Sequence, residues 1–110
     1  MNKTMLAVMV LGLLGAGPVE HTVEVKLTEY KIEMPIQLSA GRTLFKVTNA
    51  GGMFHRFEIE GKGSEKEIES GLDAGQTKTL KLDLEPGDYE VYCPVHGHKK
   101  AGMSLKLRVS

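Results

Sequence analysis

One stretch near the C-terminus decides the fold: Tyr92-Cys93-Pro94-Val95-His96-Gly97-His98-Lys99-Lys100-Ala101-Gly102-Met103. It holds the single cysteine of the 110-residue chain and two of its four histidines, together with a methionine. A thiolate, an imidazole and a thioether are the donors of copper electron-transfer sites, where two His and one Cys lie roughly trigonal and a weak Met is axial. The stretch supplies three of these four donors, and His55 is well placed to supply the second imidazole.

Each of these residues also has an ordinary interpretation. A lone cysteine is most often a small buried hydrophobic residue, a surface histidine is usually solvated, and a methionine usually belongs to the core. Their combination in one glycine-punctuated loop, with His55 upstream, favours a metal site. A dinuclear copper centre of the oxidase type would need two cysteines, and the chain has one.

Outside this loop the chain alternates apolar and polar residues with a period of two, which is typical of half-buried strands. In 77–84 the alternation places Leu80, Leu82 and Leu84 on the buried side, and in 54–59 it points His55 inward beside Phe57. Strands are expected over 21–30, 30–34, 43–48, 54–59, 77–84, 89–92 and 103–109. The pattern predicts an all-β, antiparallel two-sheet sandwich of about seven or eight strands, with no helix after residue 20.

An immunoglobulin-like sandwich would give a similar pattern of strands. Such a domain normally has a Cys, Trp, Cys core, whereas this chain has no tryptophan and one cysteine. The candidate metal loop therefore distinguishes the two kinds of sandwich.

Residues 1–18 differ from the rest of the chain. Lys3 precedes an apolar run from Met5 to Leu14, and the small residues Gly15-Ala16-Gly17 follow, which is the pattern of a secretory signal peptide. Pro18 makes the cleavage site imperfect, so an uncleaved membrane tether is the alternative. We expect a signal peptide over 1–18, one domain over 19–110, and a periplasmic or other extracytoplasmic location.

Charge and composition narrow the class of partner. The formal net charge is +0 at pH 7, and the Lys and Arg residues form no stripe, so nucleic acid is not expected as a partner. The sequence contains no Ser/His/Asp set, and no paired carboxylates lie near the loop. It therefore gives no sign of catalysis. A monomer without enzymatic activity is expected.

Two motifs carry a resemblance to a known family. Asn49-x-Gly51-x-x-x-His55-x-Phe57 and Tyr92-Cys93, followed by Gly97-His98 and Gly102-Met103, are similar to the two ligand segments of the cupredoxins, the small blue copper proteins. The resemblance covers residues 21–110, and the ligand loop is most similar to those of rusticyanin and auracyanin. It implies a Greek-key β-sandwich and a mononuclear type 1 copper ion. It also implies the ligands: His55, Cys93 and His98 in the equatorial plane and Met103 on the axis.

One ligand has an alternative, and two residues depart from the family pattern. The shorter Cys-x2-His spacing of plastocyanin would recruit His96, although Gly97-His98 fits the longer loops better. Arg56 follows His55 where many members have a small hydrogen-bonding residue, yet its backbone N–H could still reach the Cys93 sulfur. Pro94 has no N–H to donate.

The resemblance implies a one-electron carrier that exchanges electrons with a redox protein such as a cytochrome or an oxidase. The ring edge of His98 is the expected point of electron exit. A copper-trafficking or copper-storage module with the same donors is the alternative function.

Overall fold

The structure is a computed structural model that describes residues 20–110. The predicted signal peptide, residues 1–18, lies outside the described residues. Among the residues described, no helix is long and apolar enough to cross a membrane.

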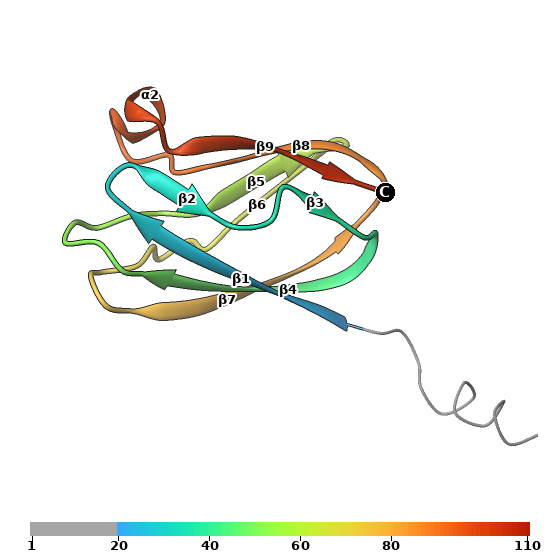
Figure 1. The fold of residues 1–110 in the computed structure, drawn as a ribbon, viewed down its shortest axis with the longest axis horizontal. Helices are drawn as coiled ribbons and strands as arrows, with labels where there is room; N and C mark the ends of the chain where they lie inside the picture. The colour runs from blue at the N-terminus through green and yellow to red at the C-terminus, as the bar shows by residue number, and fades with distance from the viewer. Residues whose placement is uncertain (1–19) are drawn as a thin grey trace, which may run out of the picture.

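Two β-sheets pack face to face (Figure 1). The first has four strands in the order β2-β1-β4-β7. These strands are β1 (Glu20–Thr28), β2 (Lys31–Glu33), β4 (Gly41–Asn49) and β7 (Thr77–Leu84). The second has five strands in the order β3-β9-β8-β5-β6. They are β3 (Gln37–Leu38), β5 (Glu58–Gly61), β6 (Ser64–Glu67), β8 (Gly87–Tyr92) and β9 (Ser104–Val109).

The two-sheet sandwich is confirmed, but the strands are not all antiparallel. β1 pairs with β4 in parallel over residues 20–27 and 42–49, and β3 pairs with β9 in parallel. The cause is the connection between β1 and β4: it carries β2 back along β1 and then crosses to the other sheet as β3. A parallel pair needs such a crossover. In all, the described residues form nine strands of mixed orientation, compared with the seven or eight antiparallel strands expected.

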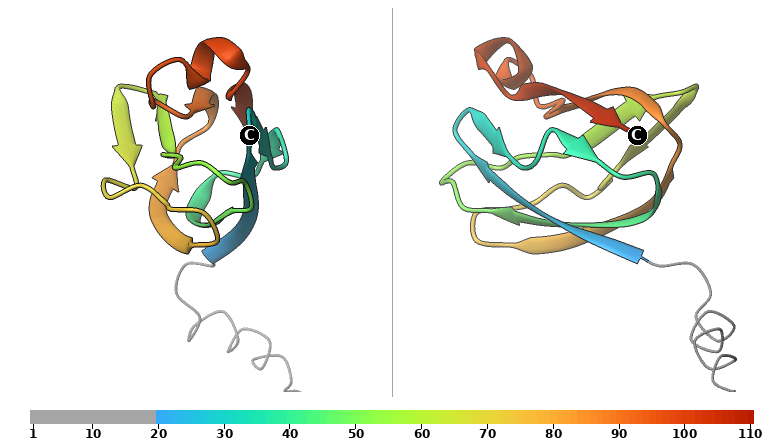
Figure 2. Two further views of the ribbon diagram at one scale, coloured as in Figure 1. Left: turned by 90° about the vertical axis from the view of Figure 1, so that its left-hand side faces the viewer. Right: turned by 45° about the vertical axis from the view of Figure 1, so that its right-hand side comes forward.

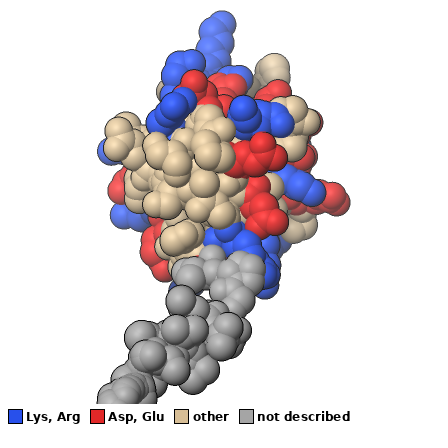
Figure 3. Space-filling view, turned by 90° about the vertical axis from the view of Figure 1, so that its right-hand side faces the viewer, with Lys and Arg blue, Asp and Glu red and all other residues tan. Residues whose placement is uncertain are grey.

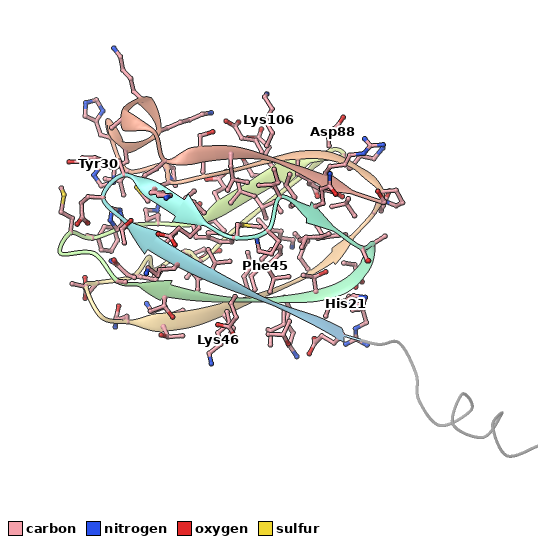
Figure 4. All side chains as sticks on the ribbon, viewed as in Figure 1. His21, Tyr30, Phe45, Lys46, Asp88 and Lys106 are labelled. Atoms are coloured by element: carbon pink, nitrogen blue, oxygen red, sulfur yellow. The ribbon has the colours of Figure 1, made fainter. Side chains whose placement is uncertain are left out.

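The core lies between the sheets and follows the predicted alternation. Val25 and Leu27 of β1 are buried, and so are Phe45 and Val47 of β4. Phe45 points inward, whereas its neighbour Lys46 points away from the second sheet (Figure 4). The rings of Phe45 and Phe57 meet across the core with centroids 5.7 Å apart. Burial of such apolar surface is the main source of stability in a domain of this size.

One part of the predicted core is covered less well than expected. Leu84 is buried, but Leu80 and Leu82 are only half-buried. β7 is the edge strand of its sheet, so neighbours cover its inward face on one side only. The predicted face of β7 is therefore correct, although its burial is incomplete.

The two ends of the sandwich differ. The link between β4 and β5 and the link between β8 and β9 lie at the same end, where the latter forms the one-turn helix α2 (His98–Ala101) (Figure 2). This short helix was not expected from the sequence. Figure 3 shows the opposite end, where uncharged residues fill the middle of the face and charged side chains surround them.

Candidate metal centre

His55 is fixed by the segment that follows β4. Asn49 is fully buried, and its amide Nδ2 donates to the carbonyls of Met53 (2.8 Å) and Leu72 (2.9 Å). Its Oδ1 accepts the N–H of Gly51 at 2.9 Å. The backbone of His55 then exchanges two hydrogen bonds with Leu72, at 3.1 and 2.8 Å. These contacts hold His55 in place although the segment lies between strands.

The second segment folds back on itself between β8 and β9. The Cys93 N–H donates to the Met103 carbonyl (3.1 Å), and the Met103 N–H donates to the His98 carbonyl (3.0 Å). Gly97 and Gly102 flank α2 with φ of 84° and 127°, a region that glycine adopts at little cost. The loop thus brings a thiol, an imidazole and a thioether residue into one compact turn.

Three of the four predicted ligands converge. His55 Nδ1 lies 3.2 Å from His98 Nδ1, and Cys93 Sγ lies 3.6 Å from the same His98 nitrogen. One potential ligand atom of each of the three residues lies within 4.8 Å of the others. The cluster includes His98, whereas His96 is exposed.

The cluster is closed to solvent. His55 and Cys93 are 0% exposed and His98 is 6% exposed. Met103 is also fully buried, and it is tied to Cys93 and His98 through its backbone.

The chemistry of the donors fits copper. Two imidazole nitrogens with one thiol match the trigonal set of a blue copper site, and the thioether of the buried Met103 is the type of group that supplies its weak axial donor. Ring nitrogens held 3.2 Å apart would bring two lone pairs together unless a proton or a cation lies between them. A metal cation there would accept both lone pairs.

The sulfur of Cys93 has a hydrogen-bond donor where the sequence suggested one. The Arg56 N–H donates to Cys93 Sγ at 3.3 Å. The guanidinium of Arg56 turns away and pairs with Glu67, so its charge is partly compensated. Arg56, which stands where many cupredoxins have a small residue, therefore still provides the backbone contact to the Cys93 sulfur.

The electrostatics of His98 favour its neutral form. Burial lowers the pKa of His98 from its ordinary value, and the nearby His55 lowers this pKa further. Neutral imidazole is the form that binds a metal. The loop thus favours the ligating form of His98.

Two residues at the site were not anticipated from the sequence. Glu29 Oε2 lies 2.7 Å from His55 Nε2. The hydrogen bond from the Gly52 N–H lowers the pKa of Glu29 most, and the contact with His55 lowers this pKa further. The ring of Tyr30 stands edge-on to that of His98 with centroids 5.2 Å apart, at the same end as α2 (Figure 4). Glu29 and Tyr30 follow β1 in a turn, and no local pattern distinguishes them from other surface turn residues.

The fold is shared with known copper proteins. Auracyanin B is 20% identical, with a TM-score of 0.68 over 87% of this chain and 92% of that chain. Auracyanin A, described as a "blue" copper protein from Chloroflexus aurantiacus, is 16% identical with a TM-score of 0.65, covering 84% and 100% of the two chains. The copper-containing nitrite reductase of Thermus scotoductus has a TM-score of 0.60 at 13% identity, but the match covers 27% of that chain and 83% of this one. No curated protein sequence matches the chain significantly.

A family model identifies the chain more directly. The model of the sulfocyanin (SoxE) domain matches residues 6–110, which include both segments that form the cluster. The resemblance to cupredoxins is thereby confirmed. The chain belongs to the sulfocyanin family of cupredoxins, whose cofactor is a single copper ion.

Proposed function

We propose that the protein is a one-electron carrier that uses a mononuclear type 1 copper site. His55, Cys93 and His98 would hold the metal, with Met103 as the weak fourth donor. The observation that carries this proposal is the burial of the whole donor set, in which no residue is more than 6% exposed. When bound, copper supplies a reversible change between Cu(I) and Cu(II).

Burial favours a carrier over a trafficking module. A trafficking site must let the ligands of a partner reach the metal while its own ligands leave. Here His55 and Cys93 are wholly enclosed, and backbone hydrogen bonds hold Cys93 to Met103 and His55 to Leu72. A site held in this way keeps its geometry when the charge on the metal changes.

The surface around the site suits a transient redox partner. Tyr30, Met53 and Phe54 are 40%, 42% and 43% exposed, and the Tyr30 hydroxyl lies 3.6 Å from the Met53 sulfur. An apolar surface of this kind allows close approach with little desolvation of charge. We propose that a redox protein such as a cytochrome or an oxidase docks on this surface, beside the small part of the His98 side chain that is exposed to solvent.

Positive charge beside the loop contributes only weak steering of a partner. Lys99 donates to Glu90 at 3.1 Å and lies 4.4 Å from the centroid of the Tyr92 ring, so its charge is partly compensated. Lys100 is exposed and provides weak attraction to an acidic partner.

Export and the absence of catalysis belong to the same proposal. An exported carrier with one cysteine is protected from random oxidation when that thiolate binds metal. The fold also occurs as part of larger copper enzymes, whereas the match to auracyanin B covers 92% of that chain. We propose an extracytoplasmic monomer without an enzymatic reaction.

Stopped-flow kinetics tests the carrier against the trafficking alternative. The copper-loaded protein is mixed with a reduced and then with an oxidised small redox protein, and copper content is measured after each cycle. A parallel assay mixes the reduced protein with an apo copper acceptor. Fast reversible electron exchange with retained copper supports the carrier, whereas slow exchange with ready copper transfer would assign the protein to trafficking.

A further inference from the structure

The carboxylate of Glu29 links the turn after β1 to the segment that carries His55. Oε2 lies 2.7 Å from His55 Nε2 and accepts the Met53 N–H at 3.1 Å, while Oε1 accepts the Gly52 N–H at 3.0 Å. The side chain is 30% exposed, in contrast to the fully enclosed imidazole that it contacts. Glu29 is thus the polar partner of the His55 nitrogen that faces away from the cluster.

The backbone around Glu29 leaves room for this carboxylate. A Cβ atom at Gly51 would collide with both carboxylate oxygens of Glu29. Asn49 holds the same segment through the N–H of Gly51. The loop therefore wraps the carboxylate closely, which gives its contact with His55 a defined geometry.

This contact determines which nitrogen of His55 carries the proton. A carboxylate accepts hydrogen bonds and cannot donate one when ionised, so Nε2 holds a proton, and in the neutral imidazole Nδ1 therefore keeps its lone pair. Nδ1 is the atom that lies 3.2 Å from His98 Nδ1 in the cluster. His55 is therefore in the ligating tautomer before any metal binds.

The charge of the carboxylate acts on the metal as well. A carboxylate that accepts the distal N–H of a ligating histidine raises the basicity of that ligand. Its negative charge also interacts more strongly with the more highly charged ion. Cu(II) gains more from both effects than Cu(I) does.

We propose that Glu29 is a positioning residue of the copper site, which fixes the Nε2-protonated tautomer of His55 and lowers the reduction potential by stabilising Cu(II). The inference rests on the copper site of the proposed function and is independent of the carrier role. A purely structural Glu29 would only anchor the loop at Gly52 and Met53.

Electrochemistry separates these two roles. Glu29→Gln removes the charge but keeps an oxygen that can accept the Nε2 proton. The matched control is Glu85→Gln, which removes the same charge in the exposed turn between β7 and β8, at the opposite end of β8 from Cys93. Loss of such a partner commonly weakens metal binding by about 10-fold or more. A tenfold loss confined to Cu(II) raises a one-electron potential by about 59 mV.

The expected result is a raised midpoint potential in Glu29→Gln, an unchanged potential in Glu85→Gln, and a retained blue to green absorption in both. If copper-loaded Glu29→Gln has the same midpoint potential as Glu85→Gln, the proposal that Glu29 lowers the reduction potential is wrong. Loss of stability of the metal-free Glu29→Gln protein without that shift would leave Glu29 with the structural role alone.

Nitrogen-15 NMR of the metal-free protein tests the tautomer without copper. Wild type, Glu85→Gln and Glu29→Gln should show His55 protonated at Nε2, whereas Glu29→Ala should show a mixture of tautomers. A single Nε2-protonated tautomer in Glu29→Ala would overturn the positioning role. This measurement needs no metal. A failure of copper binding would therefore count against the proposed function, whereas the tautomer of His55 would still be tested.

Discussion

At the scale of single residues, Cys93 has the most restricted surroundings. Its sulfur is 0% exposed, accepts the Arg56 N–H at 3.3 Å and lies 3.6 Å from His98 Nδ1. A thiol in this position has one donor and one imidazole as neighbours, and both are compatible with a thiolate bound to a metal.

The first prediction concerns colour. A Cu(II)–thiolate bond gives intense visible charge-transfer absorption, so the Cu(II)-loaded protein should be blue to green. Cys93→Ser should abolish the absorption, measured by visible spectroscopy at equal copper content. A colourless Cu(II) complex of the unaltered protein would contradict the type 1 assignment.

The second prediction distinguishes the two candidate histidines of the loop. His98 is buried within the cluster, whereas His96 is exposed. His98→Ala should destroy the chromophore or make it sensitive to added imidazole, since it removes a nitrogen ligand. His96→Ala is the matched control and should leave the visible spectrum nearly unchanged. The reverse outcome would reassign the ligand to the shorter, plastocyanin-like spacing.

The third prediction concerns the axial position. The axial donor of a blue copper site is weak but tunes its potential. Met103→Leu should keep copper bound and raise the midpoint potential, because an apolar residue donates nothing to Cu(II). Cyclic voltammetry with copper analysis checks both effects. An unchanged spectrum and potential would show that Met103 is not a ligand.

At the scale of elements, the link from β4 to β5 depends on one side chain. Asn49 makes three hydrogen bonds at 2.8 to 2.9 Å and is fully buried. Its loss would leave the Gly51 N–H and the Met53 carbonyl without this partner. The position of His55 therefore depends on a residue that does not itself approach the metal.

The fourth prediction follows from these contacts. Asn49→Ala should lower the free energy of unfolding of the metal-free protein by about 3 kcal/mol, since each buried group left without a partner costs about 1–3 kcal/mol. Urea denaturation measures the change. The control is Thr48→Ala, whose hydroxyl bonds Thr77 at the surface and whose loss should cost no more than about 1 kcal/mol. Equal losses in the two variants would contradict the proposed role of Asn49.

The elements also show what a local pattern can predict. The range of β7 agrees with the expected 77–84. The inward direction of His55, Phe57 and Ile59 is confirmed by their burial, but the strand expected over 54–59 begins only at Glu58, which is itself buried. Alternation determines which side chains share a face but carries no information about which strand lies alongside. The parallel pairing of β1 with β4 is therefore not readable from either strand.

The candidate site also has one part that the local sequence predicts and another that depends on tertiary packing. The loop from Cys93 to Met103 could be found because its donors are close in the sequence, and His55 could be added by its spacing and by the resemblance. Glu29 could not be found, because it meets His55 only through the packing of two segments that are 26 positions apart. The one-turn helix α2 is too short for a periodic signal.

At the scale of the whole molecule, the site depends on the two sheets together. His55 follows β4 of the first sheet, whereas Cys93 and His98 lie between β8 and β9 of the second. Global folding therefore brings the donors together, and anything that shifts the protonation of the site changes the stability of the entire domain.

The last prediction concerns the metal-free protein in mild acid. The pKa of His98 in the folded state lies below its ordinary value of 6.5, chiefly because of burial. Between these two pKa values the unfolded chain binds more protons at this residue than the folded chain does. The contribution of His98 to stability is therefore fully present above pH 6.5 and is lost as the pH falls through 6.5 toward the folded pKa.

Urea denaturation at several pH values from 7.5 to 5.5 measures this loss. The metal-free wild type should lose stability over this range, and His98→Ala should show a smaller loss, whatever its absolute stability. His96→Ala, which removes an exposed imidazole from the same loop, is the matched control. The carboxylates with lowered pKa, Glu29 and Glu90, titrate below their ordinary value of 4.5 and do not contribute in this window. Equal slopes in wild type and His98→Ala would show that burial of His98 does not make the fold sensitive to acid.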